Sequence, residues 1–428
     1  MKSVIVSQPR DVVRGVGAEH GSVAIVLRAL ADRLAARADL HVVAPSANGR
    51  TGVTTAAGGF ALHTVPAGGR TRQKLADLAL GILGTGLPMF ARDSYFPAYA
   101  QAVAGEIGAL RPDIVHLMTY PQLIGPIRAA APGARLVLHL HDETLTRLPD
   151  ELVARRLEPF SAIVTCSRWL AGALARRQPQ LAERIHAIGN GVDVGQFRCG
   201  ALVPEDYPKL LFVGRVSPEK GPQVLIDAFL RLADRWPDLR LVLAGPVGLI
   251  PYSFIRLIAA DPPMRGALPF YGNGPVSRFM RQIVHGRTSF ADALRARVPA
   301  AYADRVHFAG GMAHDRIPGL MGARTIFVQP SLCEEPFGLP LAEAMATGVP
   351  SIGSRRGGIP EIIDDGRSGR LVEAGDDEAL ARAIEAMLGD PPAAARMGVA
   401  GAEGIRKAFS WDDVAERLWR VWQNSPIV

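Results

Sequence analysis

The stretch PKLLFVGRVSPEKGPQVLIDAFLRLADRW, residues 208–236, places a strand, a loop and a helix in immediate succession. Its first part, PKLLFVGR (208–215), is a short apolar run of strand length, and a helical pattern follows from Gln223. Between them lies the glycine-bounded loop GRVSPEKG (214–221). This order of elements is the building unit of a parallel sheet covered by helices.

The same alternation runs along most of the chain. Further strand-like runs alternate with helical stretches such as VAIVLRALADRLAAR (23–37), and the runs are continuously apolar. Continuous apolar strands are typical of parallel sheets with both faces covered. The predicted strands are SVIVS (3–7), LHVVAP (40–45), PDIVHL (112–117), ARLVLHLH (134–141), SAIVTCS (161–167), LRLVLAG (239–245), DRVHFAG (304–310), RTIFVQP (324–330) and VPSIGS (349–354).

An irregular stretch, GNGVDVGQFRCGALVPEDYP (189–208), divides this alternation into two series and is typical of a linker. We therefore predict an α/β protein with two doubly wound, Rossmann-like parallel-sheet domains facing across a cleft. The predicted domains are residues 1–198 and 199–404, followed by C-terminal helices at 405–428. Ligands of such sheets bind beyond the carboxyl ends of the strands, so chemistry is expected at the cleft.

Composition narrows the class of protein. The chain has 428 residues, of which 48% are hydrophobic, so it can bury large cores. Its apolar runs fall short of the roughly 18 residues that span a bilayer, and MKSVIVSQPRD lacks the features of a signal peptide. Cys166, Cys199 and Cys333 have no metal-ligand spacing and are expected to be buried thiols. These features indicate a cytoplasmic protein.

The net charge of +7 lies entirely in the first half, because residues 1–198 contain 22 Lys and Arg against 15 Asp and Glu. Without a basic run interleaved with aromatics, or a known motif, we expect no nucleic acid partner. An anionic small molecule or a membrane surface fits better. The apolar segment LADLALGILGTGLPMF (75–90) is flanked by Arg70, Arg72, Lys74 and Arg92. It is predicted either to contact the inner face of the membrane peripherally or to pack within the N-terminal domain.

The loop GRVSPEKG is a candidate phosphate site. A loop between a strand and a helix exposes backbone N–H groups and the positive end of the helix dipole. Arg215 and Lys220 add positive charge, and the chain has only five lysines. The alternative is a solvated turn in which Glu219 is an ordinary helix-start residue.

The second candidate is EEPFGLPLAEAMATGVP (334–350), in which Pro340 and Gly348 predict the two ends of a helix. Glu335 precedes that helix and Glu343 lies in it. A carboxylate can accept hydrogen bonds from vicinal hydroxyls of a ribose or a hexose. Two acids, two cations and a helix start together match a nucleotide sugar; taken singly, the acids could be a helix-start residue and part of a solvated face.

Together these residues resemble the family-4 retaining glycosyltransferases, which have the GT-B fold. The resemblance covers nearly the whole chain. It includes EPFGLPLAE (335–343), preceded by VQPS (328–331) and followed by GVPSIGSRRGGIPEIIDDGRSGRLV (348–372). It also includes GRVSPEKG, NGVDVGQF (190–197), RPDIVHL (111–117) and FSWDDVAERLWRVW (409–422). The last of these looks like the terminal helices that cross back onto the N-terminal domain in such folds.

The resemblance implies a role for each matching residue. Arg215 and Lys220 would hold the donor diphosphate, Glu343 the ribose hydroxyls, and Glu335 hydroxyls of the transferred sugar. Backbone N–H groups of Phe337, Gly338 and Leu339 would line the sugar and phosphate. His141, at the end of LVLHLH, matches the active-site histidine; a structural histidine is the alternative.

The chain departs from the family pattern in two places. The family commonly has a Gly-Gly pair before the first helix, whereas Gly21-Ser22 is the best match here and Gly17 is a second candidate. Residues 246–304 also exceed the family minimum and carry Tyr252, Phe254, Phe270, Tyr271 and Phe279, which could shape a substrate pocket or form a local core.

The implied reaction moves a hexose from a nucleoside-diphosphate sugar, with a UDP-sugar favoured, to an acceptor hydroxyl with retention of configuration. The acceptor would be a saccharide, a lipid-linked molecule or a small molecule, as in glycolipid or surface-polysaccharide synthesis. No cofactor and no metal are expected, because protein cations can stabilise the leaving diphosphate. The alternatives are a sugar-nucleotide epimerase or phosphorylase on the same fold, or a non-catalytic nucleotide-sugar-binding protein.

Overall fold

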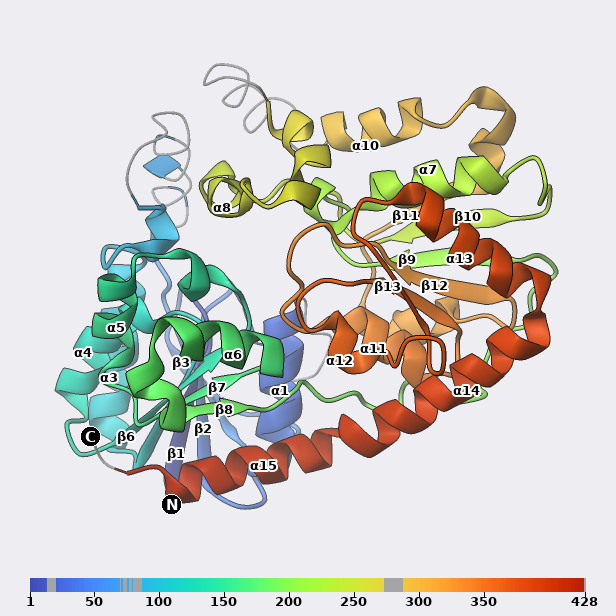
Figure 1. The fold of residues 1–428 in the computed structure, drawn as a ribbon. Coiled ribbons are helices and arrows are strands. Elements are labelled where there is room, and N and C mark those ends of the chain that lie inside the picture. Colours follow the sequence, from blue (N-terminus) through green and yellow to red (C-terminus); the bar gives the residue numbers. More distant parts are fainter. Residues whose placement is uncertain are drawn as a thin grey trace. The chain divides into compact units, whose positions relative to one another are not determined.

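The computed structural model describes residues 1–13, 21–69, 71, 75–76, 79, 87–272 and 288–426. The described residues form two compact units (Figure 1). The N-terminal unit contains the described residues up to Gly191 together with those from Trp411 onward. The C-terminal unit runs from Val192 to Ser410.

The N-terminal unit is built on an eight-stranded sheet with the order β3-β4-β2-β1-β5-β6-β7-β8. Every neighbouring pair is parallel except β3 with β4. Its strands are β1 Lys2–Val6, β2 Asp39–Pro45, β3 Gly52–Thr55, β4 Ala61–Val65, β5 Ile114–Met118, β6 Arg135–Leu140, β7 Ala162–Thr165 and β8 Ile185–Ala187. Its helices are α1 Ser22–Leu34, α3 Pro97–Leu110, α4 Ile124–Ala130, α5 Asp150–Leu157, α6 Arg168–Arg177 and α15 Trp411–Asn424.

Burial along the central strand shows why this sheet is covered on both sides. Val4, Ile5 and Val6 point alternately to opposite faces of β1, and all three are fully buried. Helix α1 buries an apolar stripe with helical spacing, from Ala24 to Leu34. The continuous apolar strands therefore predicted the covered parallel sheet correctly.

The last helix, α15, belongs to the N-terminal unit although it follows the whole C-terminal unit in sequence. It packs against α1, as Figure 1 shows. Trp422 is fully buried, and its Nε1–H donates a hydrogen bond to His116 Nδ1 at 3.1 Å. The preceding helix, α14 (Pro391–Ala408), stays with the C-terminal unit, so the chain returns to the N-terminal unit at Trp411.

The C-terminal unit contains an all-parallel six-stranded sheet with the order β11-β10-β9-β12-β13-β14. Helices α7 and α13 pack together on one side of it, and α11 and α14 on the other (Figure 1). The strands are β9 Lys209–Val213, β10 Arg240–Ala244, β11 Val306–Gly310, β12 Thr325–Gln329, β13 Ser351–Ser354 and β14 Arg370–Val372. The helices are α7 Pro222–Leu232, α8 Tyr252–Ile258, α10 Thr288–Ala296, α11 Leu339–Ala346, α12 Ile359–Ile362, α13 Asp377–Gly389 and α14.

The long segment between β10 and β11 adds helical pieces to this unit, among them α8, the short 3-10 helix η7 (Leu268–Tyr271) and α10. Its described aromatics contribute to the core. The rings of Phe270 and Phe290 are 4.9 Å apart, and Tyr271 is only 1% exposed. Phe279 lies outside the described residues.

Several features of the basic first half also lie outside the described residues. They are Gly17, Arg70, Arg72, Lys74 and most of the apolar segment 75–90. Where that segment is described, Met89 and Phe90 are buried, and Arg92 Nε donates a hydrogen bond to the Leu87 carbonyl at 3.0 Å. In the described part of the chain, the helices are too short or too polar to cross a membrane.

None of the three cysteines, all of which lie in the described residues, forms a disulfide. Cys166 and Cys333 are buried, as expected. Cys199 is only partly buried and lies in a turn near the start of the C-terminal unit, outside its strands and helices.

Candidate functional site

The two sequence motifs meet at the point where the strand order of the C-terminal sheet reverses. Strand β9 starts the sheet and is followed outward by β10 on one side and by β12 on the other. The loop after β9 carries Arg215 and Lys220, and the loop after β12 carries Glu335. Because successive connections leave this point in opposite directions, the carboxyl ends of the two strands form a crevice in which such folds bind ligands.

Close backbone contacts hold the two loops together. Gly221 has a φ of +74°, and a Cβ at this position would lie 1.9 Å from the Pro330 carbonyl oxygen. A side chain larger than hydrogen is therefore excluded. The Glu219 carbonyl also accepts hydrogen bonds from the N–H groups of Leu332 and Cys333, at 2.9 and 3.2 Å.

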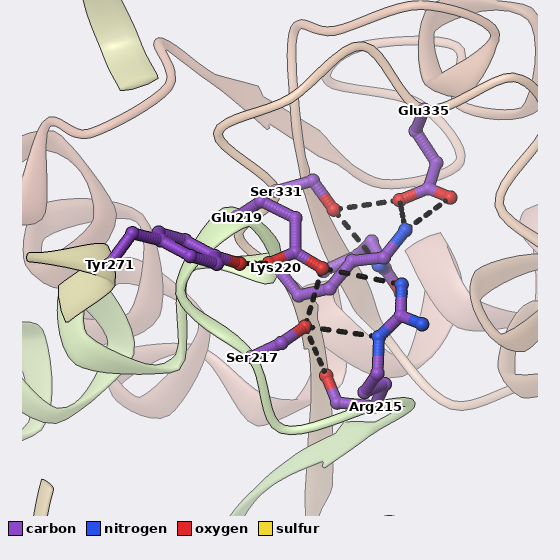
Figure 2. A network of polar contacts seen from close by, with 8 residues as sticks. Arg215, Ser217, Glu219, Lys220, Tyr271, Ser331 and Glu335 are labelled. Atoms are coloured by element: carbon purple, nitrogen blue, oxygen red, sulfur yellow. Dashed lines mark hydrogen bonds and ion pairs between the residues drawn. The ribbon is translucent and has the colours of Figure 1, made fainter. Parts of the chain in front are cut away.

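Lys220 and Glu335 form an ion pair across the loops (Figure 2). Lys220 Nζ lies 2.8 Å from Glu335 Oε1 and 2.7 Å from Oε2, and Ser331 Oγ donates to Oε2 at 2.9 Å. Burial alone would lower the pKa of Lys220, but the charge of Glu335, the neighbouring Cys333 and the hydrogen bond to Glu335 together outweigh that effect and raise the pKa above its ordinary value. The lysine is therefore fully protonated.

Arg215 is held by a second acid, Glu219 (Figure 2). Glu219 Oε1 accepts hydrogen bonds from Ser217 Oγ at 2.6 Å and from an Arg215 terminal nitrogen at 3.3 Å. Tyr271 Oη donates to the other oxygen, Oε2, at 2.8 Å. Glu219 is only 2% exposed, so the alternative of a solvated turn with an ordinary helix-start acid is wrong.

The helix between the two predicted acids, α11, begins with Leu339 and has Pro340 in its first turn, close to the predicted start. Gly338, the residue before the helix, has a φ of +104°, which favours glycine. The N–H groups at such a helix start have no intrahelical partner and can bind an anion. Phe337 is buried beside Phe409, with ring centroids 5.4 Å apart, and fixes the loop that leads into the helix.

Glu343 forms a buried pair with His314, which follows β11. His314 Nε2 lies 2.6 Å from Glu343 Oε1, and the His314 ring packs 5.4 Å from that of Phe197. Burial raises the pKa of Glu343, and the hydrogen bond to His314 opposes that rise. Burial alone would lower the pKa of His314, but the hydrogen bond and charge of Glu343 raise it. The pair therefore holds a proton more tightly than separate side chains would.

In the N-terminal unit, His141 follows β6 directly and so stands at the carboxyl end of a strand, as predicted. It belongs to a cluster with His139 and His116, which we call the histidine cluster. The rings of His139 and His141 are 4.2 Å apart, and His116 Nε2 lies 3.3 Å from His139 Nδ1. Burial lowers the pKa of His116 and of His141 to about 3. The pKa of His139 is lowered by burial and by its two histidine neighbours.

Gly21, the predicted glycine-loop contact, immediately precedes α1. Its φ of +102° favours glycine, and a Cβ there would lie 3.7 Å from the Asp11 carboxylate oxygens. Gly17, the second candidate for this contact, is outside the described residues.

The structure thus brings most of the predicted site residues together in one unit, and His141 and Gly21 belong to the other unit. Sequence analysis did not assign His314 or Ser331 to this site. It left Tyr271 open as a pocket or core residue, and it considered Glu219 only as a solvated helix-start acid. His314 had a usable signal, since it follows the predicted strand DRVHFAG and so lies near the carboxyl edge of a parallel sheet. Tyr271 had no such signal.

The groups at the crevice suit a ligand with a diphosphate and hydroxyls. Two cations and a helix start can bind phosphate oxygens, while two carboxylates can accept hydrogen bonds from sugar hydroxyls. In the part of the chain that is described, His, Cys, Asp and Glu side chains do not gather in threes in a way that could hold a metal ion.

Two family models match this chain. The one described as "Glycosyltransferase Family 4" matches residues 23–196. The one described as "Glycosyl transferases group 1" matches residues 196–265 and 283–404. The candidate site residues of the C-terminal unit lie within the second match, apart from Tyr271, which falls in its gap.

Individual relatives are distant in sequence. The chain is 24% identical over 347 residues to spore coat protein SA of Bacillus subtilis, covering 76% of this chain and 82% of the relative. It is 29% identical over 286 residues to an alpha-maltose-1-phosphate synthase of Mycolicibacterium smegmatis, covering 63% and 64%.

Solved structures share the fold over almost the whole chain. Sucrose-phosphate synthase of Thermosynechococcus elongatus superposes with a TM-score of 0.72 at 20% identity, covering 99% of this chain and 98% of that one. Anabaena Alr3699/HepE, solved in complex with UDP and glucose, superposes with a TM-score of 0.67 at 19% identity, covering 99% of both chains.

Proposed function

The chain belongs to the family-4 glycosyltransferases and has their GT-B fold, and on that premise we propose that it transfers a hexose from a nucleoside-diphosphate sugar to an acceptor hydroxyl with retention of configuration. One observation carries the proposal. The cations of GRVSPEKG and the acids of EPFGLPLAE, far apart in sequence, meet at the switch point of the C-terminal sheet.

Each predicted site residue is assigned one part of the donor to bind, and its surroundings in the structure support that assignment. Arg215 and Lys220 bind the donor diphosphate, together with the N–H groups at the start of α11. Glu335, beside Lys220, accepts hydrogen bonds from the transferred sugar. Glu343, buried in α11 and paired with His314, accepts them from the ribose. His141 is neutral at physiological pH, and its Nε2 has no hydrogen-bond partner among the described residues, so it is available to a sugar hydroxyl.

Departure of the nucleoside diphosphate is the step that these cations assist. Negative charge grows on the leaving phosphate as the bond to the anomeric carbon breaks, and fixed cations stabilise that charge without having to reorient. The acceptor oxygen then attacks from the face that the phosphate leaves, and the phosphate takes the acceptor's proton. Lys220 must exchange Glu335 for a phosphate oxygen when the donor binds.

We assign this stabilisation to the protein's own cations and propose that catalysis requires no metal. The support is that a protonated lysine and an arginine lie in the same loop, at the carboxyl end of β9. A UDP-sugar is the favoured donor, since the structural neighbour Alr3699/HepE has been solved with UDP-glucose.

For the acceptor we propose a glycolipid or surface-polysaccharide intermediate, reached by peripheral contact with the inner face of the membrane. The support is the excess positive charge of residues 1–198 and the cationic flanks of the apolar segment 75–90. The protein should co-sediment with anionic vesicles, less so at high salt. Leu83→Asp, in that segment, should weaken co-sedimentation and leave donor binding intact. Equal recovery with neutral and anionic vesicles would favour a soluble acceptor.

A donor-hydrolysis screen tests the proposed reaction. The full chain is incubated with UDP-, GDP-, ADP- and dTDP-sugars, and released nucleotide and sugar are followed by chromatography and NMR. We expect hydrolysis of one donor class with the anomeric configuration retained in the first-formed sugar. Inversion would refute the retaining mechanism, and an interconverted sugar nucleotide would indicate an epimerase. Binding of a donor without any turnover, with or without candidate acceptors, would indicate a non-catalytic binding protein.

A further inference from the structure

Tyr271 stands out because it reaches the candidate site from a segment that the family model does not match. The family match stops at residue 265 and resumes at 283, and Tyr271 lies between these limits, at the end of η7. Its side chain is nevertheless among the most deeply buried in the C-terminal unit. This segment therefore places a buried phenol next to a site whose other residues lie within the family match, where it can influence how those residues are oriented.

The Tyr271 hydroxyl acts as a hydrogen-bond donor to Glu219. Burial, together with the neighbouring Glu219 charge, raises the pKa of Tyr271 well above its ordinary value, so the phenol keeps its proton. The bond to Glu219 Oε2 is 2.8 Å long and buried. It therefore satisfies one oxygen of an acid that is almost without solvent.

The other oxygen of Glu219 holds Arg215 by a single, longer contact. Glu219 Oε1 receives Ser217 Oγ at 2.6 Å, whereas the Arg215 nitrogen lies at 3.3 Å. The Arg215 side chain is 46% exposed. Arg215 Nε also donates to Ser217 Oγ at 3.3 Å. Glu219 thus orients Arg215 without engaging it through two parallel bonds, and the other terminal nitrogen of the guanidinium points away from Glu219 (Figure 2).

Loss of the Tyr271 hydroxyl would change how Glu219 holds Arg215. Glu219 Oε2 would be left buried without its donor, which is costly for a charged group. The guanidinium next to it can satisfy both oxygens by a two-pronged contact, the geometry that arginine and carboxylate favour. Arg215 would then turn toward Glu219 and away from any phosphate.

The chain shortly before this unmatched segment also contacts the loop beyond Glu335. Asp261 forms an ion pair with Arg356 at 3.3 Å, and Arg356 pairs with Glu334 at 2.9 Å. The Gly358 N–H, two residues after Arg356, donates to the Glu335 carbonyl at 2.7 Å. The residues that lead into the unmatched segment are therefore tied to the loop that carries Glu335, and the segment itself is tied to the loop after β9 through Tyr271.

We propose that Tyr271 is a positioning residue: by holding Glu219 Oε2, it keeps the Arg215 guanidinium free to bind the donor diphosphate. This rests on the proposed function, because it presumes that Arg215 meets a nucleoside diphosphate. The inference assigns a task in donor binding to the segment that lies beyond the family match.

A double-mutant cycle with UDP as the probe tests the proposal. Calorimetry on the full chain compares wild type, Tyr271→Phe, Arg215→Ala and the double variant. Tyr271→Phe should weaken UDP binding about tenfold, the size expected for one hydrogen bond to a charged group. In the Arg215→Ala background the same change should have less than about a twofold effect, because its target is gone.

Two further variants separate positioning from a general loss of structure. Tyr302→Phe removes another phenol–carboxylate bond of the long stretch between β10 and β11, from Tyr302 to Asp234 at 2.6 Å, and should leave UDP affinity unchanged. Adding Glu219→Gln to Tyr271→Phe removes the charge that recaptures Arg215, and should restore UDP affinity to within about twofold of wild type. Because this double variant has no buried, unsatisfied Glu219 charge, its UDP affinity also tests the proposal when Tyr271→Phe alone folds poorly.

An equal loss of affinity from Tyr271→Phe in both the wild-type and Arg215→Ala backgrounds would overturn the proposal, as would failure of Glu219→Gln to restore binding. A wild-type protein that binds neither UDP nor GDP, ADP or dTDP would instead refute the donor site itself, and the positioning role with it.

Discussion

Replacing Glu335 with glutamine should improve binding of UDP while impairing sugar transfer. In the ligand-free protein, Lys220 Nζ contacts both Glu335 oxygens, at 2.8 and 2.7 Å. UDP lacks the transferred hexose that Glu335 is proposed to bind, so toward UDP this acid acts only as a competitor for Lys220. Toward the whole donor, the same acid contributes hydrogen bonds to the reacting sugar.

The structure sets the size of this effect. Two unit charges about 2.8 Å apart attract by about 6 kcal/mol at an effective dielectric constant of about 20. The side chains are 20% and 11% exposed, so solvent and desolvation remove most of that energy. We take the ion pair to oppose UDP binding by the remaining energy, about 1.4 kcal/mol, and loss of that opposition lowers the Kd for UDP about tenfold. Glu335→Gln should therefore bind UDP about tenfold more tightly, while kcat for transfer falls on the order of 10²-fold.

Calorimetry with UDP and steady-state kinetics with the active donor measure the two effects. The matched control is Glu205→Gln, which breaks a Lys–Glu pair of similar burial, with Lys209 at the opposite end of β9. The control should lower stability and leave UDP affinity unchanged. Weaker UDP binding by Glu335→Gln, or an unchanged kcat, would refute the ion-pair exchange.

Three other predictions follow from the site and its surroundings. Glu343→Gln should mainly raise KM for the donor, because the ribose is held throughout the reaction; a purely kcat effect in steady-state kinetics would contradict its role. Arg215→Ala should lower turnover on the order of 10²-fold, and wild-type activity should survive EDTA; full, reversible loss on chelation would refute the metal-free mechanism. Acid should destabilise the protein through the histidine cluster, whose pKa values are lowered by burial. Its stabilising contribution is present above the unfolded pKa of about 6.5 and should decline toward pH 3, by up to about 1.4 kcal/mol per pH unit and histidine. Urea unfolding at pH 7 and pH 5 measures this decline, and equal stability at both would contradict it.

The sequence predicted the strands that are buried on both faces, because such strands are continuously apolar and easily recognised. It missed β3, β4, β8 and β14. Strands β8 and β14 have only 3 residues each, and β3 is exposed along its whole length. An edge strand of this kind depends on its neighbour more than on its own residues.

The charged residues of the site could be predicted because they lie in two contiguous motifs. The side chains that pair with them could not be predicted. Glu219 has the same sequence context whether it is solvated or buried, and its burial depends on Tyr271, 52 residues later. His314 and Glu343 are likewise paired only through the order of β11, β12 and the strands between them.

The most direct test of the donor site is calorimetric titration of wild type and Lys220→Ala with the nucleoside diphosphate of the hydrolysed donor. The site predicts that wild type binds this diphosphate without added metal, and that Lys220→Ala binds it on the order of 10²-fold more weakly at unchanged thermal stability of the N-terminal unit. Equal affinity of the two proteins would show that the diphosphate binds elsewhere, and the assignment of the crevice between β9 and β12 would be wrong.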